Sequence, residues 1–447
     1  MAKVIPFRGV LYDPDVVKEV AQVVAPPYDV IDPAGQAALH ARHPNNVIRL
    51  ELGIEQQTDG PTANRYTRAA ATLRDWLQSG VLRRDTHPAV YPYSIEYHPP
   101  SAGNRGAKKT LRGILATIAL EEFGTGHIYP HENTRAAAKA DRLELLQVCR
   151  ANFSPIWALF SDQTSSIENL VWNSIDRTRP LIDFRDDEGF RQCLWKISDR
   201  TVLDRLTQEM NSKPLFIADG HHRYETALTY RRTRRQQGDA GVGSALRPYD
   251  TVLMLLSSME DPGLTVLPTH RVLTSPLPAL DQIKKQLSDV CRIDEFPFNQ
   301  TTESATRTRF LDALQSQGSQ AHAFGLVLRD TAAYYVLTLR GEYQTRLGTS
   351  PRERLDVSIL HNEILNRLGA NTATEGSTVY TKDEREAIEL VHRGEQPAAV
   401  LLNATKVSEV QAVAAAGERM PHKSTYFYPK PLTGLVINVF EEGNAER

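Results

Sequence analysis

The chain has 447 residues, which is long for a single hydrophobic core and predicts two or more subdomains. Hydrophobic residues make up 41% of the sequence and charged residues 24%, which is the balance of a globular protein. The formal net charge is only -2, and this excludes a strong overall field that would gather nucleic acid or an anionic membrane surface.

Compartment and partners are bounded by what the sequence lacks. No run approaches the roughly 20 apolar residues that span a bilayer, so we expect no membrane partner. The first residues lack the apolar core of a signal peptide. The three cysteines (Cys149, Cys193 and Cys291) lie far apart without a CxxC pair, which indicates a reducing compartment and no cysteine-based zinc site. We expect a cytoplasmic protein.

The first elements are predicted from proline placement and from hydrophobic periodicity. Paired prolines in APPYDVI hold residues 25–31 extended and predict a loop. Apolar residues recur at helical spacing over 61–80, with a proline near the start and a glycine at the end, so a helix is expected there. The apolar runs at 89–97 and 111–120 predict two strands joined by a turn.

The middle of the chain alternates loops, strands and helices. Residues 126–134 form a polar loop that opens a helix carrying Asp141 and Arg142. The segment 152–160 predicts a loop and then a buried strand, and a further strand at 215–217 leads into a helix. The continuous apolar run 251–256 predicts a strand buried on both faces.

The composition turns richer in proline, serine, threonine and asparagine near residue 276, where we place a boundary between an N-terminal region, 1–275, and a C-terminal region, 276–447. The second region should contain a hairpin at 324–339, a strand and helix at 399–415, and a terminal lysine-bearing hairpin at 423–439. The predicted fold class is a mixed α/β structure.

The strongest chemical signal is Asp219-Gly220-His221-His222-Arg223, which joins a strand to a helix. Free backbone N–H groups at a helix start attract anions, and Gly220 permits a sharp turn and a close ligand approach. Arg223 can bind phosphate oxygens in a bidentate manner, and the histidines add donors whose charge is tunable near neutral pH. We therefore predict a phosphate site here.

Other readings of this segment stay open. Asp219 can hold Mg²⁺, orient a histidine or cap the helix, and both histidines can be half-buried structural residues. Metal chelation by the histidine pair alone is disfavoured, because adjacent helical residues point about 100° apart.

Two carboxylates are candidates for a general base. Glu132 lies just before the helix that carries Asp141, where a carboxylate can accept a hydroxyl proton or can simply complement the helix dipole. Asp29 follows two prolines in a rigid loop, and turn formation is its alternative role.

Further cations are candidates for contacts with phosphates. His270 and Arg271 follow Pro268, and Lys423 and Lys430 lie in the terminal segment. Surface salt bridges and protection of an edge strand are the structural alternatives for these residues. The cluster RRTRR at 231–235 is interpreted as the solvated end of a helix, where cations are favourable. The sequence contains no P-loop, complete GxGxxG, HExxH or GxSxG motif, so a nucleotide would need the DGHHR site.

The segment IADGHHRYETAL resembles the phosphate-binding signature of the ParB/sulfiredoxin superfamily, and its DGHHR form is most similar to that of the free serine kinases. The chain also resembles, nearly end to end, a bacterial and archaeal family known as domain of unknown function 1015. The segments that carry this wider resemblance are APPYDVI (25–31), PHENT (130–134), NFSPIW (152–157), ADGHHRYETA (218–227), LPTHRV (267–272) and MPHKSTYFYPKPLTGL (420–435).

The resemblance implies a ParB/sulfiredoxin-like core with additional α/β subdomains, and contacts from the glycine, histidine and arginine of DGHHR to nucleotide phosphates. It implies a kinase that uses ATP or ADP with Mg²⁺ to phosphorylate a small hydroxyl compound, free L-serine first. The superfamily also implies a competing role, a non-catalytic nucleotide switch or DNA-associated regulator. That role predicts a broad positive face near 231–235, whereas the kinase predicts a closed pocket of mixed charge around His221.

Overall fold

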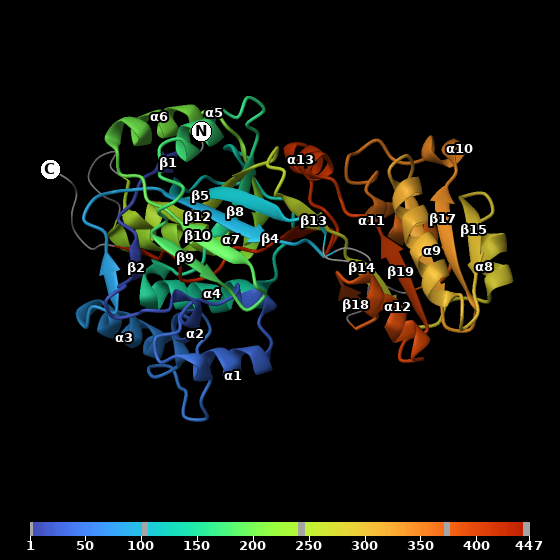
Figure 1. The fold of residues 1–447 in the computed structure, drawn as a ribbon, viewed down its shortest axis with the longest axis horizontal. Helices are drawn as coiled ribbons and strands as arrows, with labels where there is room; N and C mark the ends of the chain where they lie inside the picture. Colours follow the sequence, from blue (N-terminus) through green and yellow to red (C-terminus); the bar gives the residue numbers. More distant parts are fainter. Residues whose placement is uncertain (1–2, 101–105, 240–245, 371–375, 441–447) are drawn as a thin grey trace.

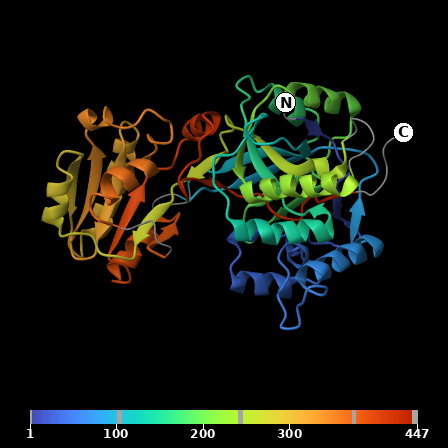
Figure 2. The same cartoon turned by 180° about the vertical axis from the view of Figure 1, so that it is seen from behind.

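The computed structural model describes residues 3–100, 106–239, 246–370 and 376–440. The chain forms a large lobe and a small lobe that meet at a narrow waist, and both ends of the chain lie on the large lobe (Figure 1). Seen from behind, the same two lobes remain separate except at this waist (Figure 2).

The large lobe is built on a nine-stranded mixed sheet. Its strands in spatial order are β6 (Ile128–Tyr129), β11 (Leu215–Asp219), β8 (Ile156–Phe160), β12 (Thr251–Ser258), β5 (Lys109–Ala119), β4 (Tyr91–Tyr97), β10 (Arg191–Leu194) and β9 (Ile182–Arg185), with β1 (Val4–Ile5) also paired to β5. The β6–β11 and β8–β12 pairs are parallel and the other pairs are antiparallel.

The central strands are apolar on both sides because both faces of the sheet are covered. On β12, Met254 faces one core and Leu253 and Leu255 face the other. The first face packs against α5 (Ser166–Trp172), α6 (Arg200–Met210) and α7 (His221–Arg234). The second face packs against α13 (Val407–Ala415) and the C-terminal segment from Phe427 to Val436.

A helical layer lies along one side of the large lobe (Figure 1). It shares a core with a short strand pair near the N-terminus, and α4 packs against both α3 and α7. The layer and the short strands beside it are α1 (Pro33–Arg42), α2 (Ile48–Glu51), α3 (Arg65–Gln78), α4 (Ala136–Cys149), the β2 (Val10–Tyr12) and β3 (Leu82–Arg84) pair, and the β7 (Ala151–Asn152) and β21 (Asn438–Val439) pair.

The small lobe is a six-stranded antiparallel sheet between two sets of helices. Phe324 of β16 faces α8 and α11, whereas Val327 faces α9 and α12, so this strand is also buried throughout. The strands in order are β15 (Cys291–Pro297), β17 (Ala333–Leu339), β16 (Ala323–Leu328), β19 (Ala398–Leu402), β14 (His270–Leu273) and β18 (Thr378–Thr381). The helices are α8 (Leu280–Gln286), α9 (Glu303–Gly318), α10 (Gly341–Gln344), α11 (Asp356–Ile359), which continues into the π-helical segment η5 (Leu360–Leu365), and α12 (Glu384–His392).

The small lobe is an insertion within the large one. The chain enters at β14 and leaves after β19, and these strands are antiparallel neighbours. The segment after β19 returns to the large lobe, where β20 (Tyr426–Tyr428) pairs with β13 (Thr265–Leu267) and β21 pairs with β7. The expected terminal hairpin at 423–439 is therefore wrong, because each of its strands pairs with an earlier strand.

Most other expected elements agree with the structure. The mixed α/β class is confirmed, as are the helix after Pro61, which begins at Arg65, and the strand–helix junction at DGHHR. The hairpin at 324–339 is present as β16 and β17. None of the helices in the described ranges is both long and apolar enough to cross a membrane.

The return of the C-terminal segment makes a prediction about independent folding. A fragment of residues 1–275 lacks Phe427, Leu435 and Val436, which are buried in the core of the large lobe. We expect this fragment to show no cooperative thermal unfolding by circular dichroism, because that core is left open. A chain in which a short glycine linker replaces residues 270–402 should unfold cooperatively. Cooperative unfolding of 1–275 alone would contradict this assignment.

Candidate functional site

A pocket of about 360 Å³ opens at the N-terminal end of α7. It is lined by four separate segments, at 28–30, 132–138, 218–223 and 422–430. Its volume falls within the range usual for small-molecule sites, and its walls carry several charged side chains. The DGHHR segment predicted from the sequence forms one of these walls.

The start of α7 is shaped by Gly220. The strand β11 is interrupted by a bulge between Ile217 and Asp219, and Gly220 then adopts a left-handed backbone conformation with φ of 94°. No side chain caps the helix, so the amide groups of its first turn are available to an anion. A Cβ at Gly220 would lie 3.0 Å from the guanidinium of Arg223. Both features favour glycine here.

A buried ion network crosses the floor of the pocket. Arg223 Nη2 donates to Asp219 Oδ2 at 2.6 Å, and Lys430 Nζ donates to Asp219 Oδ1 at 2.7 Å. Lys430 also donates to Asp29 Oδ2 at 2.5 Å. The network joins three distant parts of the sequence, and Arg223 is further held by the carbonyl oxygen of Pro155.

The charges in this network stabilise one another. Burial alone would raise the pKa of Asp219, but Lys430 and Arg223 hold it well below its usual range. Burial alone would lower the pKa of Lys430, yet Asp219 and Asp29 raise it above the ordinary value for lysine. Both groups are therefore ionised at neutral pH.

The first histidine of the motif is a buried neutral group with a defined tautomer. The backbone N–H of His131 donates to Nε2 of His221 at 3.2 Å, so the His221 proton lies on Nδ1. That nitrogen faces Glu132 Oε2 at 3.7 Å. Burial lowers the pKa of His221 well below its usual value, and the two imidazole rings pack edge to face at 4.6 Å.

His131 is oriented in the same way. Its Nδ1 donates to the carbonyl oxygen of Ile217 at 2.7 Å, and Nε2 accepts a hydrogen bond from the Thr425 hydroxyl at 3.1 Å. Burial lowers the pKa of His131 to about 4, so this side chain is neutral too. His131 thus ties the end of β11 to the C-terminal segment.

Glu132 lines the same pocket as Asp219. Its side chain is about one-third exposed, and no hydrogen bond to it occurs within the described part of the chain. Burial raises its pKa; Lys423 and Lys430 oppose this shift, whereas Asp219 and Asp29 add to it. A half-buried carboxylate with a raised pKa and free oxygens can accept a proton from a ligand.

Lys423 is presented by a strained turn that the small lobe holds. Its backbone is left-handed, with φ of 56°, which is uncommon for a residue other than glycine. Arg271 Nη2 donates to the carbonyl oxygen of Lys423 at 2.9 Å and contacts that of His422 at 3.5 Å. The Arg271 side chain is fully buried and stacks on Tyr380 with its guanidinium 5.4 Å from the ring centre.

The structure brings most of the predicted site residues together. The residues Asp29, Glu132, Asp219, Gly220, His221, His222, Arg223, Lys423 and Lys430 all line the pocket. His222 lies at its edge, where Nε2 accepts the backbone N–H of Arg135 at 2.9 Å.

Three of the roles expected from the sequence do not match the contacts in the structure. His270 and Arg271 do not line the pocket. Arg271 was expected to bind a phosphate, but its guanidinium instead binds backbone carbonyl oxygens of the turn at Lys423. Arg223 already donates to Asp219 and Pro155, so only its remaining N–H groups can bind a ligand. Both oxygens of Asp219 are paired with cations, so Mg²⁺ would have to displace one of them.

Several contributing residues were absent from the predicted site. Thr425 and His422 line the pocket, and Tyr28 does so beneath the stacked guanidinium of Arg142, 4.2 Å from its ring. These residues lie in the APPYDVI and MPHKST segments, and their place in these segments was the only feature of the sequence that pointed to them. Their spatial meeting depends on contacts between segments far apart in the sequence.

A substitution at Gly220 tests the geometry of the helix start. Gly220→Ala should lower the free energy of unfolding by about 2–3 kcal/mol, since left-handed backbone costs an L-residue about 1–2 kcal/mol and the new Cβ presses on Arg223. Gly80→Ala is the matched control, because Gly80 has φ of 80° with open space around its Cβ position, and should lose only the first contribution. Equal losses in chemical denaturation would contradict the role of the Arg223 contact.

The chain was compared with known proteins and structures. A free serine kinase mutant in complex with AMP is 14% identical, with 70% of this chain and 89% of that chain covered and a TM-score of 0.35. A conserved hypothetical protein from Pyrococcus furiosus is also 14% identical, covering 69% and 90% with a TM-score of 0.32. SbnI with a C-terminal truncation, from Staphylococcus aureus, is 11% identical, covering 71% and 85% with a TM-score of 0.33.

No curated protein matches the sequence. The family model described as "Protein of unknown function (DUF1015)" matches residues 4–358, which is most of the chain and includes the strand–helix junction at Gly220. The chain therefore belongs to the DUF1015 family.

Proposed function

We propose that this protein is a nucleotide-dependent kinase that phosphorylates a hydroxyl group of a small compound, with free L-serine as the first candidate. The observation that carries the proposal is the position of Glu132. This carboxylate accepts no hydrogen bond within the described residues, although His221 and His422 approach its oxygens to 3.7 and 3.9 Å. Its pKa is raised, and it shares one pocket with an uncapped helix start and two lysines. The serine assignment rests on the resemblance of DGHHR to the motif of free serine kinases.

The phosphates of the nucleotide bind at the start of α7. Backbone N–H groups from Gly220 to Arg223 and the positive end of the helix dipole favour the anion. Lys423 and Lys430 add positive charge from the C-terminal segment that lines the same pocket. Arg223 acts indirectly, because it holds Asp219 and through it the orientation of Lys430.

Glu132 accepts the proton of the acceptor hydroxyl as that oxygen attacks the terminal phosphorus. The new bond joins the acceptor oxygen to phosphorus, and the bond from phosphorus to the bridging oxygen of the nucleotide breaks. The nucleotide leaves with one phosphate fewer, as ADP from ATP or as AMP from ADP. Positioning and electrostatic stabilisation supply most of the rate in such a transfer.

Neutral His221 has a supporting role in this scheme. Its Nδ1–H points toward Glu132 and remains protonated on that nitrogen because Nε2 is occupied. It therefore stabilises the carboxylate form of Glu132 without competing for the substrate proton. His222 lies at the edge of the pocket and is assigned to the phosphate side of the site.

Mg²⁺ enters the proposal as part of the nucleotide substrate. Asp219 does not fit the role of a metal ligand in this arrangement, because its two oxygens already bind Lys430 and Arg223. Among the described residues, no group of three His, Cys, Asp or Glu side chains is arranged to hold an ion. We assign no step of the reaction to a metal bound by the protein.

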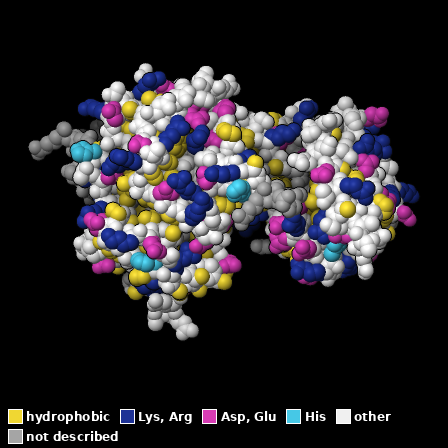
Figure 3. All heavy atoms as spheres, in the orientation of Figure 1, with side chains coloured by type: hydrophobic (Ala, Val, Ile, Leu, Met, Phe, Trp, Pro, Cys, Tyr) yellow, Lys and Arg dark blue, Asp and Glu magenta, His cyan; other side chains and the backbone are white. Residues whose placement is uncertain are grey.

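The competing role as a DNA-associated switch has less support. Arg231 and Arg232 pair with Glu122, and Arg235 pairs with Asp250, so acidic partners offset the basic cluster. Positive and negative side chains are interspersed over both lobes on the face seen in Figure 3. The mixed charges around His221 favour a closed small-molecule site instead.

The proposed base can be removed without changing side-chain size. The protein is incubated with ATP or ADP, Mg²⁺ and a panel of amino acids and sugars. We expect nucleotide turnover that depends on the acceptor, measured by chromatography of the phosphorylated products. Glu132→Gln should lower kcat by about 10²–10⁴-fold, which is the usual contribution of a general base. Glu144→Gln, an exposed site on α4, should retain full activity. Turnover that needs no acceptor would contradict the kinase, and an active Glu132→Gln would exclude Glu132 as the base.

The pH dependence follows from the raised pKa of Glu132. The base must be ionised, so kcat/KM should fall as the pH drops through a pKa above the ordinary value for glutamate. Lys423 lowers this pKa, and Lys423→Met should therefore move the acidic limb of the profile to higher pH. Lys139→Met, whose lysine pairs with Glu225, should leave the limb unchanged. A limb that stays in place or moves to lower pH in Lys423→Met would refute the assignment.

A further inference from the structure

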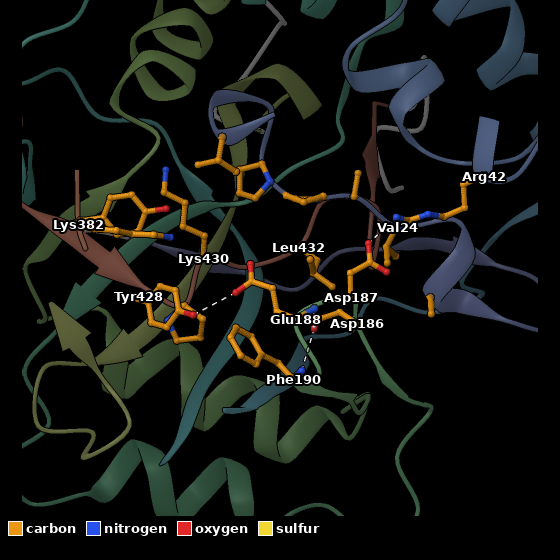
Figure 4. Close-up of a pocket in the computed structure, with 17 residues that line it drawn as sticks. Val24, Arg42, Asp186, Asp187, Glu188, Phe190, Lys382, Tyr428, Lys430 and Leu432 are labelled. Carbon is orange, nitrogen blue, oxygen red and sulfur yellow. Dashed lines mark hydrogen bonds and ion pairs between the residues drawn. The ribbon is translucent and has the colours of Figure 1, made fainter. Parts of the chain in front are cut away.

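A second pocket is drawn in Figure 4. It adjoins the pocket at the start of α7, here called the phosphate pocket, and shares Lys430 with it. It lies between the segment 21–30, the turn that joins β9 to β10, and the C-terminal segment 426–432. Val30, Tyr426 and Lys430 line both pockets, so one ligand can extend from one pocket into the other.

The walls of the second pocket are largely apolar. Phe190 and Tyr428 pack edge to face with ring centres 6.0 Å apart, and Pro26, Pro27 and Leu432 complete the lining used here. Apolar and aromatic walls of this kind suit a ring, which buries apolar surface against them.

The carboxylates around this pocket already have hydrogen-bond or ion-pair partners. Asp186 accepts hydrogen bonds from the backbone N–H groups of Glu188 and Phe190, and Asp187 pairs with Arg42 at 2.5 Å. Glu188 accepts a hydrogen bond from the Tyr428 hydroxyl at 3.2 Å. Because its carboxylates already have partners, the apolar interior favours an uncharged group over an ion.

Lys382 from the small lobe and Lys430 flank Tyr426. Their ammonium groups lie 4.9 and 5.5 Å from the centre of the Tyr426 ring. Lys430 lines both pockets, but it already pairs with Asp219 and Asp29. Lys382 has no carboxylate partner among the described residues, so its charge favours a negatively charged part of the ligand beside Tyr426.

We infer that the second pocket binds the base of the nucleotide while its phosphates cross Lys430 to the start of α7. This inference rests on the proposed function, because it assumes that the phosphate pocket holds a nucleotide. The second pocket has about 80 Å³ of room, on the order of six water molecules, which suits one ring system and not a whole nucleotide. The acceptor then occupies the remaining part of the larger pocket beside Glu132.

The test compares ATP with tripolyphosphate, which has the phosphates and lacks the base. Isothermal titration of the full chain with Mg²⁺ present should show ATP binding at least about tenfold more tightly than tripolyphosphate. Phe190→Ala, which removes a wall, and Ala21→Trp, which fills the pocket from a partly exposed position, should each weaken ATP binding about five- to tenfold. Neither variant should change tripolyphosphate binding.

Phe298→Ala is the matched control, because Phe298 is a partly buried ring that packs on Tyr334 in the small lobe, away from both pockets. It should bind both ligands as the unmodified protein does, and thermal unfolding checks that all variants are folded. Equal affinities for ATP and tripolyphosphate, or losses in Phe190→Ala and Ala21→Trp that are the same for both ligands, would overturn the base pocket and leave the phosphate site standing. Failure of the unmodified protein to bind either ligand would overturn the proposed function and the base pocket together.

Discussion

The contact of Lys430 with both Asp219 and Asp29 is the interaction on which the site depends. These three side chains come from the C-terminal segment, the end of β11 and the proline-rich loop, which lie far apart in the sequence. Lys430 and Asp219 are largely buried, and buried charges are costly unless they are paired, so each requires the other. The more exposed Asp29 adds a second partner for Lys430. The side chain of Lys430 also lines both the pocket at the start of α7 and the second pocket beside it. One lysine thus fixes the floor of the site and its electrostatic character.

The small lobe supports this site although its core is separate. Arg271 donates a hydrogen bond to the strained turn at Lys423. Tyr380 packs edge to face on His422 with ring centres 5.9 Å apart, and the ammonium group of Lys382 lies over the ring of Tyr426. Arg271 has no carboxylate partner among the described residues; burial lowers its pKa to about 10, still well above neutrality. Its charge is satisfied by carbonyl oxygens and an aromatic face, so it positions the turn. The insertion of the small lobe between β13 and β20 places these residues beside the pocket.

The sequence predicted local structure well and long-range pairing poorly. The strand LFIAD, the helix after Gly220 and the strand at 251–256 follow from runs of apolar residues and from turn chemistry, which act over a few residues. The terminal hairpin at 423–439 was wrong because strand pairing is decided by partners more than a hundred residues away, at Thr265–Leu267 and Ala151–Asn152. The strand–helix junction at DGHHR, where we propose the phosphate site, was predictable, since a helix start needs no distant partner. The contacts of Arg223 and Arg271 were not predictable. The carbonyl oxygens that they bind, those of Pro155 and Lys423, become their neighbours only in the folded chain.

The central claim is that nucleotide phosphates bind at the start of α7 with the acceptor beside Glu132. A crystal structure of the protein with ADP and serine tests this most directly. The account predicts phosphate density within hydrogen-bond distance of the backbone N–H groups of Gly220–Arg223, and the serine hydroxyl within reach of a Glu132 oxygen. Phosphate density elsewhere, for example against Lys3, Arg8 and Arg84 in the pocket on the N-terminal strand, with the start of α7 bound only by water, would contradict it.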